Sequence, residues 1–374
     1  MPYDTIDSQR ASVATPRIAP RWLGSLGLVL ASCLAGLVLL EIACRLMLGG
    51  PHALTHWPNL VLQSRLEAKR QQGPDLGPAY VHDPELGYLN APGYQSWVLN
   101  FDAHGLRRMP PLASGAVQAP PILATGDSYT KGDEVGDAET WPAQVQILLG
   151  WRTINAGVGA YGLDQTVLHT ERLVKALKPA VLVLGFIADD VRRAEMSRLW
   201  GREKPYFEFE RGSLVLRNVP VPMPRQPGET LTPVQALFGW SVLLDTVLDR
   251  LRLRNEWHSD QTRVLSSGTG ERLACPLMRR VAALGVPTLV VAQYLPSAWD
   301  SPAAAAEERR VTGVVLRCAE EAGLATLDVY PRFDQAIQSG GRNAVYGQWH
   351  PNWRGYRITG EAIASKLEQA KLLP

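Results

Sequence analysis

Short apolar runs alternate with longer amphipathic stretches from about residue 118 to the C-terminus, and this alternation constrains the fold more than any other feature. Residues 180–186 are apolar throughout, as expected of a strand that is buried on both faces. The elements expected in chain order are strand 121–125, helix 141–149, strand 153–155, helix 164–177, strand 180–186, helix 271–284, strand 287–293, helix 303–322, strand 324–329 and helix 353–370. Because parallel strands need crossover connections, the pattern predicts a three-layer α/β/α fold with a parallel sheet.

The N-terminal part carries an uncharged apolar run, residues 23–40, which is about the length that crosses a bilayer as a helix. Arg10, Arg17 and Arg21 precede this run, so the positive-inside bias predicts a cytoplasmic N-terminus. We therefore expect a single-pass protein of a bacterial inner membrane, with its bulk periplasmic or extracellular. The alternatives are a cleaved signal peptide and a lipoprotein acylated at Cys33, although the run remains apolar beyond that cysteine.

Shifts in composition predict how the chain is divided. The segments expected before the main domain are a cytoplasmic tail at 1–22, a transmembrane anchor at 23–45, a stalk at 46–78 and a lead-in of short strands at 79–117. The main domain, 118–374, contains an insertion at 196–262 that interrupts the alternation of strands and helices. Inserted loops at the carboxyl edge of a parallel sheet shape binding clefts, so we expect the insertion to cover part of the functional site.

Composition excludes several classes of protein. Of 374 residues, 46% are hydrophobic and 20% are charged, which is typical of a globular protein and not of a disordered or fibrous one. The formal net charge of +2 gives no reason to expect a nucleic-acid partner. The seven histidines lack the spacing of a metal site, so neither a metal nor another cofactor is expected. An exported location would allow Cys275 and Cys318 to pair, which the sequence leaves open.

Two candidate catalytic residues lie near opposite ends of the main domain. Ser128 follows Gly126 and Asp127 directly after the strand expected at 121–125, where α/β enzymes collect catalytic groups. Its loop matches neither a phosphate-binding loop nor the Gly-x-Ser-x-Gly turn of α/β hydrolases. His350 comes just before the last helix and can face the same edge of the sheet. A serine beside a histidine base is suited to nucleophilic attack on an acyl group.

Four short blocks of sequence extend this pair: Gly126-Asp127-Ser128, residues 155–165, residues 185–190 and His350-Pro351-Asn352. In this order they resemble the SGNH hydrolases, also called the GDSL family, over about residues 118–372, and the membrane-anchored bacterial branch looks most similar. The resemblance implies a flavodoxin-like fold and an acyl-serine mechanism. In that mechanism Ser128 attacks an ester carbonyl, while His350 takes its proton and later gives it to the leaving alcohol.

The resemblance also implies an oxyanion hole. Its donors would be the main-chain N–H of Ser128, an N–H of the second block at Gly159 or Ala160, and a side chain of the third block. The asparagine of the family falls on Asp189, and a carboxyl can donate a hydrogen bond only if it remains protonated.

A second departure concerns the triad acid. The acid that the family places three residues before the histidine falls on Gly347. Three interpretations are open: a Ser–His dyad, an acid from elsewhere such as Asp190 or Asp328, or a main-chain carbonyl that orients His350. Asp127 and Asp190 are expected to support the site.

The resulting expectation is a membrane-anchored serine esterase or O-acyl transferase that acts on acylated carbohydrate. Five aromatic residues could stack on sugar rings: Tyr129, Tyr161, Trp200, Trp349 and Trp353. The departures at Asp189 and Gly347 motivate an alternative, a catalytically degenerate module that binds or assembles a cell-surface glycan. The membrane anchor motivates another, a lipid-directed esterase.

Overall fold

A computed structural model describes residues 21–55, 78–199, 202–223, 233–251, 253, 257, 262–263 and 268–374. The chain divides into two compact units. The first comprises residues 1–64 and 234–251, and the second comprises residues 65–233 and 252–374. Of the expected stalk at 46–78, residues 56–77 lie outside the described residues.

The second unit is built on a five-stranded parallel sheet. Its strands are β3 (Val117–Thr125), β4 (Trp151–Asn155), β5 (Val181–Phe186), β11 (Thr288–Ala292) and β12 (Ala325–Asp328). The spatial order is β12-β11-β5-β3-β4, so the chain moves from β3 outward to β4 and then crosses to the other side of β3. This is the flavodoxin-like order, and ligands bind such sheets at the carboxyl ends of the strands, where the order reverses. The expected parallel sheet is confirmed.

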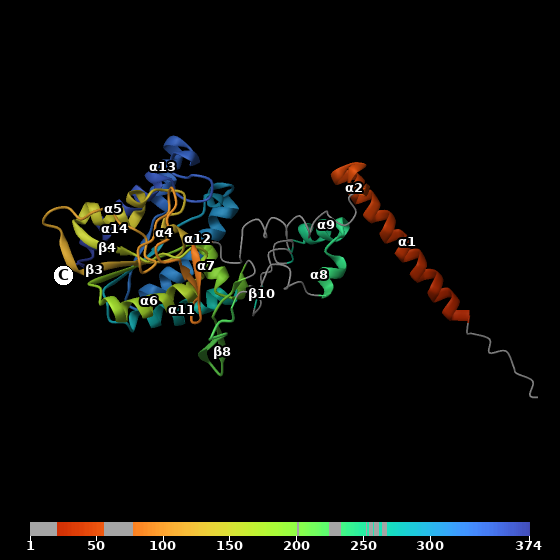
Figure 1. Ribbon diagram of the computed structural model, residues 1–374, viewed down its shortest axis with the longest axis horizontal. Helices are drawn as coiled ribbons and strands as arrows, with labels where there is room; N and C mark the ends of the chain where they lie inside the picture. The colour runs from red at the N-terminus through yellow and green to blue at the C-terminus, as the bar shows by residue number, and fades with distance from the viewer. Residues whose placement is uncertain are drawn as a thin grey trace, which may run out of the picture. The chain divides into compact units, whose positions relative to one another are not determined.

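Helices cover both faces of this sheet, as Figure 1 shows, with α5 and α14 on one face and α6 and α11 on the other. The helices of this unit are α4 (Ser128–Lys131), α5 (Trp141–Leu149), α6 (Leu163–Leu177), α7 (Ala188–Arg193), α11 (Thr269–Ala282), α12 (Pro302–Glu321), α13 (Tyr330–Gly340) and α14 (Trp353–Gln369). The predicted helices are confirmed to within a few residues at their ends. The short α7 and the amphipathic α13 were not predicted.

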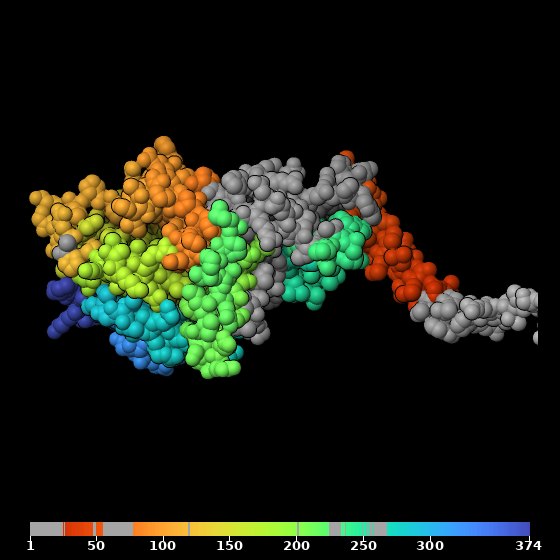
Figure 2. All heavy atoms as spheres, turned by 60° about the horizontal axis from the view of Figure 1, so that its bottom comes forward, coloured from red at the N-terminus to blue at the C-terminus, as the bar shows by residue number. Residues whose placement is uncertain are grey.

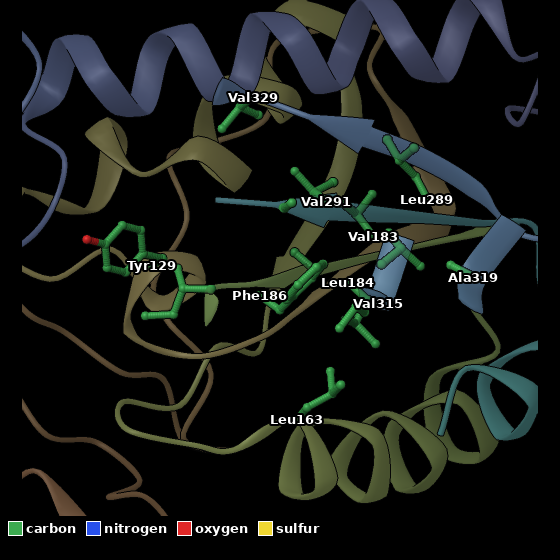
Figure 3. Packing of buried hydrophobic residues seen from close by; sticks show 14 of the residues in the cluster. Tyr129, Leu163, Val183, Leu184, Phe186, Leu289, Val291, Val315, Ala319 and Val329 are labelled. Carbon is green, nitrogen blue, oxygen red and sulfur yellow. The ribbon is translucent and has the colours of Figure 1, made fainter. Parts of the chain in front are cut away.

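The core lies between the sheet and its helices. Val183 and Leu184 of β5 and Val291 of β11 are fully buried, and Figure 3 shows them beside Leu163 of α6 and Val315 of α12. Because β5 is buried along its whole length, its apolar sequence carries no alternation, as expected of a central parallel strand.

The lead-in forms an antiparallel hairpin of β1 (Tyr80–Asp83) and β2 (Gly87–Asn90), in agreement with the short strands expected there. Within the insertion, β6 (Met196–Leu199), β7 (Arg202–Glu203) and β10 (Thr262–Arg263) form a small antiparallel sheet. A separate hairpin pairs β8 (Tyr206–Glu210) with β9 (Ser213–Arg217).

The first unit contains α1 (Arg21–Gly49), α2 (His52–Thr55) and two helices of the insertion, α8 (Pro233–Phe238) and α9 (Val242–Arg250). α8 and α9 are separated by residues 239–241, where Gly239 disfavours helix and Glu41 of α1 caps the start of α9. Within α1, residues Gly27–Met47 are long and apolar enough to cross a membrane. A signal sequence would pass the same test.

Cys275 of α11 and Cys318 of α12 form a disulfide, with their Cα atoms 4.6 Å apart. The two helices flank β11 in the sequence, so the bond joins neighbouring segments of the same helical layer. The pairing that the sequence left open is therefore present.

Candidate active site

Ser128 begins α4, directly beyond the carboxyl end of β3. Gly126 adopts a φ of 154°, and a Cβ there would lie 2.2 Å from Thr130 Oγ1 and 2.6 Å from the carbonyl oxygen of Gly185, so only glycine fits this turn. Asp127 caps the short helix, because its carboxylate accepts a hydrogen bond from the Tyr129 N–H at 2.9 Å. The turn thus holds the serine at the edge of the sheet where parallel α/β folds bind ligands.

His350 reaches this serine from the far end of the domain. Its Nε2 lies 3.0 Å from Ser128 Oγ, within hydrogen-bond distance. The loop that carries it is fixed on both sides: Asn352 caps α14 through the N–H groups of Arg354 and Gly355, and the Tyr129 hydroxyl donates to the carbonyl of Trp349 at 2.8 Å. The predicted serine and histidine are therefore brought together in the geometry of a nucleophile and its base.

Glu134 completes the arrangement from the opposite side of the histidine. Its Oε1 lies 3.0 Å from His350 Nδ1, and its carboxylate also accepts the main-chain N–H groups of Gln348 at 2.8 Å and Trp349 at 3.1 Å. Burial opposes ionisation of this carboxyl, but the hydrogen bonds from His350 and the main chain outweigh it, so the pKa of Glu134 is lowered. Glu134 is thus a carboxylate that orients His350, as the acid of a serine triad does.

Gly347 leaves the space that Glu134 occupies. A Cβ built on Gly347 would lie 2.5 Å from Glu134 Oε2, closer than real side chains come. The position of the Glu134 carboxylate therefore requires a glycine at 347.

The loop that carries Glu134 is held by Arg107 of the lead-in, whose side chain is fully buried. The guanidinium binds Asp137 Oδ1 at 2.7 Å and donates to the carbonyl oxygens of Gly132 at 3.3 Å and Val135 at 2.9 Å. Glu134 lies between these two carbonyls and has a φ of 67°, which a non-glycine residue adopts only when its surroundings enforce it. The lead-in therefore positions the candidate acid.

The second block lies beside the nucleophile, because the N–H of Val158 donates to the carbonyl of Gly126 at 3.0 Å. Over the described part of the chain, the main-chain N–H groups of Ser128, Gly159 and Ala160 have no protein acceptor, so they are available to an oxyanion. A side chain at Gly159 would meet Tyr80 Oη at 2.4 Å. Ala160 has a φ of 62°, so its turn does need the left-handed conformation that favours glycine.

Asp189 does not have the environment of a hydrogen-bond donor, which corrects its assignment to the oxyanion hole. Its side chain is about one-third exposed and pairs with Arg192 at 2.8 Å and Arg193 at 3.7 Å. A carboxylate held by two guanidinium groups is an acceptor. The condition for a donor role, burial in an apolar site, is therefore not met.

Asp127 and Asp190 are fully buried, and desolvation raises the pKa of each. Asp190 accepts the N–H of Ile187 at 3.0 Å and binds Arg193 at 2.8 Å, while Asp127 Oδ2 lies 3.4 Å from Ser128 Oγ and 3.9 Å from Arg193. Arg193 thus offsets the negative charge behind the nucleophile. Over the described ranges, no group of three His, Cys, Asp or Glu residues could hold a metal ion.

The model of the GDSL-like lipase/acylhydrolase family matches residues 124–358, which cover more than half of the chain and include Ser128, Glu134 and His350. The chain belongs to this family. Membership explains why Ser128 follows the first strand of the sheet and His350 precedes the last helix. It does not by itself identify a substrate.

Several solved structures have a similar fold. The acetylxylan esterase Axe2 from Geobacillus stearothermophilus is 16% identical, with a TM-score of 0.42 over 68% of this chain and 95% of that protein. The enzyme LAE5 from the metagenome of Lake Arreo is 15% identical, with a TM-score of 0.43 over 67% of this chain and 96% of its own. TesA is 15% identical, with a TM-score of 0.40 over 68% of this chain and 99% of its own. Curated protein sequences include no match.

Within this GDSL-like domain, the sequence left the source of the triad acid open among three interpretations. An acid does come from elsewhere in the chain, but it is neither Asp190, which binds Arg193, nor Asp328, which accepts the N–H of Tyr330. Glu134 follows the nucleophile by six positions and faces the histidine only through the turn of its loop. The indication in the sequence was a glutamate in the nucleophile's own loop combined with glycine at the family's acid position.

The aromatic residues proposed to stack on sugars divide into two groups. Tyr129 and Tyr161 are fully buried and belong to the core, which rules out stacking on a ligand. Trp349 and Trp353 expose 62% and 49% of their surfaces, and Trp349 directly precedes His350. Trp200 lies outside the described residues.

Proposed function

We propose that this member of the GDSL-like family is a serine esterase whose nucleophile, base and orienting acid are Ser128, His350 and Glu134. The observation that carries the proposal is the continuous chain of contacts, 3.0 Å from Ser128 Oγ to His350 Nε2 and 3.0 Å from His350 Nδ1 to Glu134. This arrangement argues against the degenerate binding module, because the absence of an acid at Gly347 is compensated by Glu134.

The reaction follows from the geometry. Ser128 Oγ attacks the ester carbonyl carbon as His350 accepts the hydroxyl proton. The bond to the leaving alcohol then breaks, and the same proton passes from His350 to that alcohol. Water, activated by His350, releases the acid and restores the serine, whereas a sugar hydroxyl in its place would give acyl transfer. The N–H groups of Ser128, Gly159 and Ala160 are the candidate donors to the oxyanion.

We infer that the substrate is an acylated carbohydrate. Trp349 is exposed next to the candidate base and offers a flat apolar surface for a sugar ring. A lipid-directed esterase would instead need an apolar channel for an acyl chain.

The proposed location is the outer face of a bacterial inner membrane. In this arrangement α1 is an uncleaved anchor, the N-terminus is cytoplasmic and the catalytic unit is periplasmic or extracellular. The Cys275–Cys318 disulfide favours an oxidising compartment.

The test is intact-mass detection of a fluorophosphonate adduct on the full chain in detergent, with Ser128→Ala and His350→Ala beside it. A single adduct on the wild type, lost in Ser128→Ala and much slower in His350→Ala, is the expected result. A folded wild type that stays unlabelled would contradict the esterase. O-acetylated oligosaccharides and phospholipids offered to the active protein would then test the substrate class, and hydrolysis of phospholipid alone would contradict the carbohydrate proposal.

A further inference from the structure

The end of the apolar helix α1 carries two charged residues, Glu41 and Arg45, whose side chains are buried against the insertion. They pair with each other at 2.6 Å. Charged groups at or near the hydrocarbon region of a bilayer are costly unless they are paired and hydrogen-bonded. Their partners therefore indicate what packs against the helix at this level.

Most of these partners lie in the link between α8 and α9 and in the first turn of α9, about 200 positions further along the chain. The Glu41 carboxylate accepts the N–H groups of Val242 and Leu243, each at 2.9 Å, and the hydroxyl of Ser241 at 2.8 Å. Arg45 donates to the carbonyl of Trp240 at 2.8 Å. Arg45 also donates to the carbonyl of Ala53 in α2 at 3.3 Å. Figure 2 shows the atoms of residues 233–251 in green against the red atoms of α1.

The helix pair α8–α9, residues 233–251, presents apolar side chains to its surroundings. No charged residue occurs between positions 233 and 244. Leu237 and Leu251 are about three-fifths exposed, at 62% and 61%. The other exposed apolar residues of the pair are Val234, Phe238, Trp240 and Val247.

α1 also exposes apolar side chains near its C-terminal end, namely Leu39, Leu40, Leu46 and Met47. Trp240, in the link between α8 and α9, is partly exposed, and tryptophan is enriched at the membrane–water interface. The uncharged stretch 233–244, with its exposed apolar side chains, fits lipid better than a water-facing position.

We propose that the α8–α9 pair is a second membrane contact, which lies in the outer interface of the bilayer beside α1 and is locked to it by Glu41. The proposal rests on the proposed role of α1 as an anchor. It gives the insertion a role in membrane association in addition to the cleft-forming role expected from the sequence. Because the chain passes between the two units at 64–65, 233–234 and 251–252, the catalytic unit is joined to its membrane unit by three connections.

The test uses the full chain in phosphatidylcholine vesicles that contain a phosphatidylcholine with a photoreactive acyl chain. After irradiation, lipid adducts are mapped by mass spectrometry. Adducts on both α1 and residues 234–251 are expected. Adducts on α1 alone would overturn the second contact while leaving the anchor intact, and an absence of adducts on both would overturn the anchor and this proposal together. Fluorophosphonate labelling of the same vesicles reports the esterase separately.

Two variants sharpen the result. The double variant Leu237→Asp/Phe238→Asp should lose the adducts on 234–251 and keep those on α1, whereas Trp97→Asp, which alters an exposed aromatic residue of the other unit, should change neither. Undiminished adducts in the double variant would contradict the proposal.

Glu41→Leu should speed hydrogen exchange at the amides of Val242 and Leu243, because it removes their acceptor. The matched control is Leu40→Ala, which alters the neighbouring exposed position. Unchanged exchange in Glu41→Leu would contradict the locking role of the glutamate.

Discussion

At the scale of single residues, the site depends on an exchange between positions 134 and 347. The resemblance to the family leads one to expect an acid at position 347, whereas here the carboxylate comes from the nucleophile's own loop and approaches His350 Nδ1. A triad is recognised by geometry and not by sequence position, so the same chemistry is available from either position. The exchange can be tested by reversing it.

Glu134→Ala should slow the reaction of Ser128 by about 10²- to 10⁴-fold, because His350 loses the group that orients it. Gly347→Asp alone should also impair the enzyme, since its Cβ would lie 2.5 Å from Glu134 Oε2 and place two carboxylates together. The double variant Glu134→Ala/Gly347→Asp should recover part of the activity. Fluorophosphonate labelling rates measure all three, with Glu361→Gln, an exposed acid on α14, as the control. A double variant slower than both single variants would contradict the exchange.

The lowered pKa of Glu134 also predicts a pH dependence of stability. Because the carboxyl has a lower pKa in the folded than in the unfolded chain, its stabilising contribution is complete above the unfolded value of about 4.3 and disappears as the pH falls through the folded value. The difference in melting temperature between wild type and Glu134→Gln should be largest near neutral pH and shrink in acid. A difference that grows in acid would mean that the pKa shift has the opposite sign.

At the scale of elements, the lead-in stabilises the loop that carries Glu134. Arg107 spans the loop that carries Glu134 by binding Asp137 and the carbonyls on either side of the glutamate. Lys131 of α4 does not replace this guanidinium, because it pairs with Asp133 at 2.9 Å and donates to the Tyr80 hydroxyl. The part of the lead-in that follows the β1–β2 hairpin thus supports the loop of the candidate acid.

Arg107→Met should lower the free energy of unfolding by about 3 kcal/mol, because it leaves the buried carbonyls of Gly132 and Val135 without this donor and Asp137 without its cation. It should also lower kcat more than it changes KM, since the displaced Glu134 orients the base and does not bind substrate. Thermal melting and steady-state kinetics measure the two effects, and Arg108→Met, at the exposed neighbouring position, is the control. A loss of stability with unchanged kcat would mean that Arg107 does not position Glu134.

At the scale of the whole molecule, the compartment and the disulfide are linked. Cys275–Cys318 closes a loop of 43 positions between two helices, and such bonds contribute about 2–4 kcal/mol. Cys33 and Cys44 in α1 are free. An exported catalytic unit can keep this bond, whereas a reducing cytosol would open it.

Protein isolated from membranes and unfolded without reductant should therefore expose two reactive thiols of its four cysteines. Reduction should lower the melting temperature of the catalytic unit, and Cys275→Ser should reproduce that loss while Cys44→Ser does not. Four reactive thiols before reduction would contradict both the disulfide and the proposed export.

The sequence by itself determined the sheet, the helices that cover it and the pair Ser128 and His350, because apolar periodicity and short motifs are local properties of the chain. The apolar run near the N-terminus also predicted the helix α1. Only the tertiary structure decided the identity of the acid, since Glu134 faces His350 across 216 positions of sequence and depends on the space left by Gly347. The same holds for the partners of Glu41. Contacts between distant segments are set by how elements pack, and no local pattern in one segment records which side chain of another will meet it.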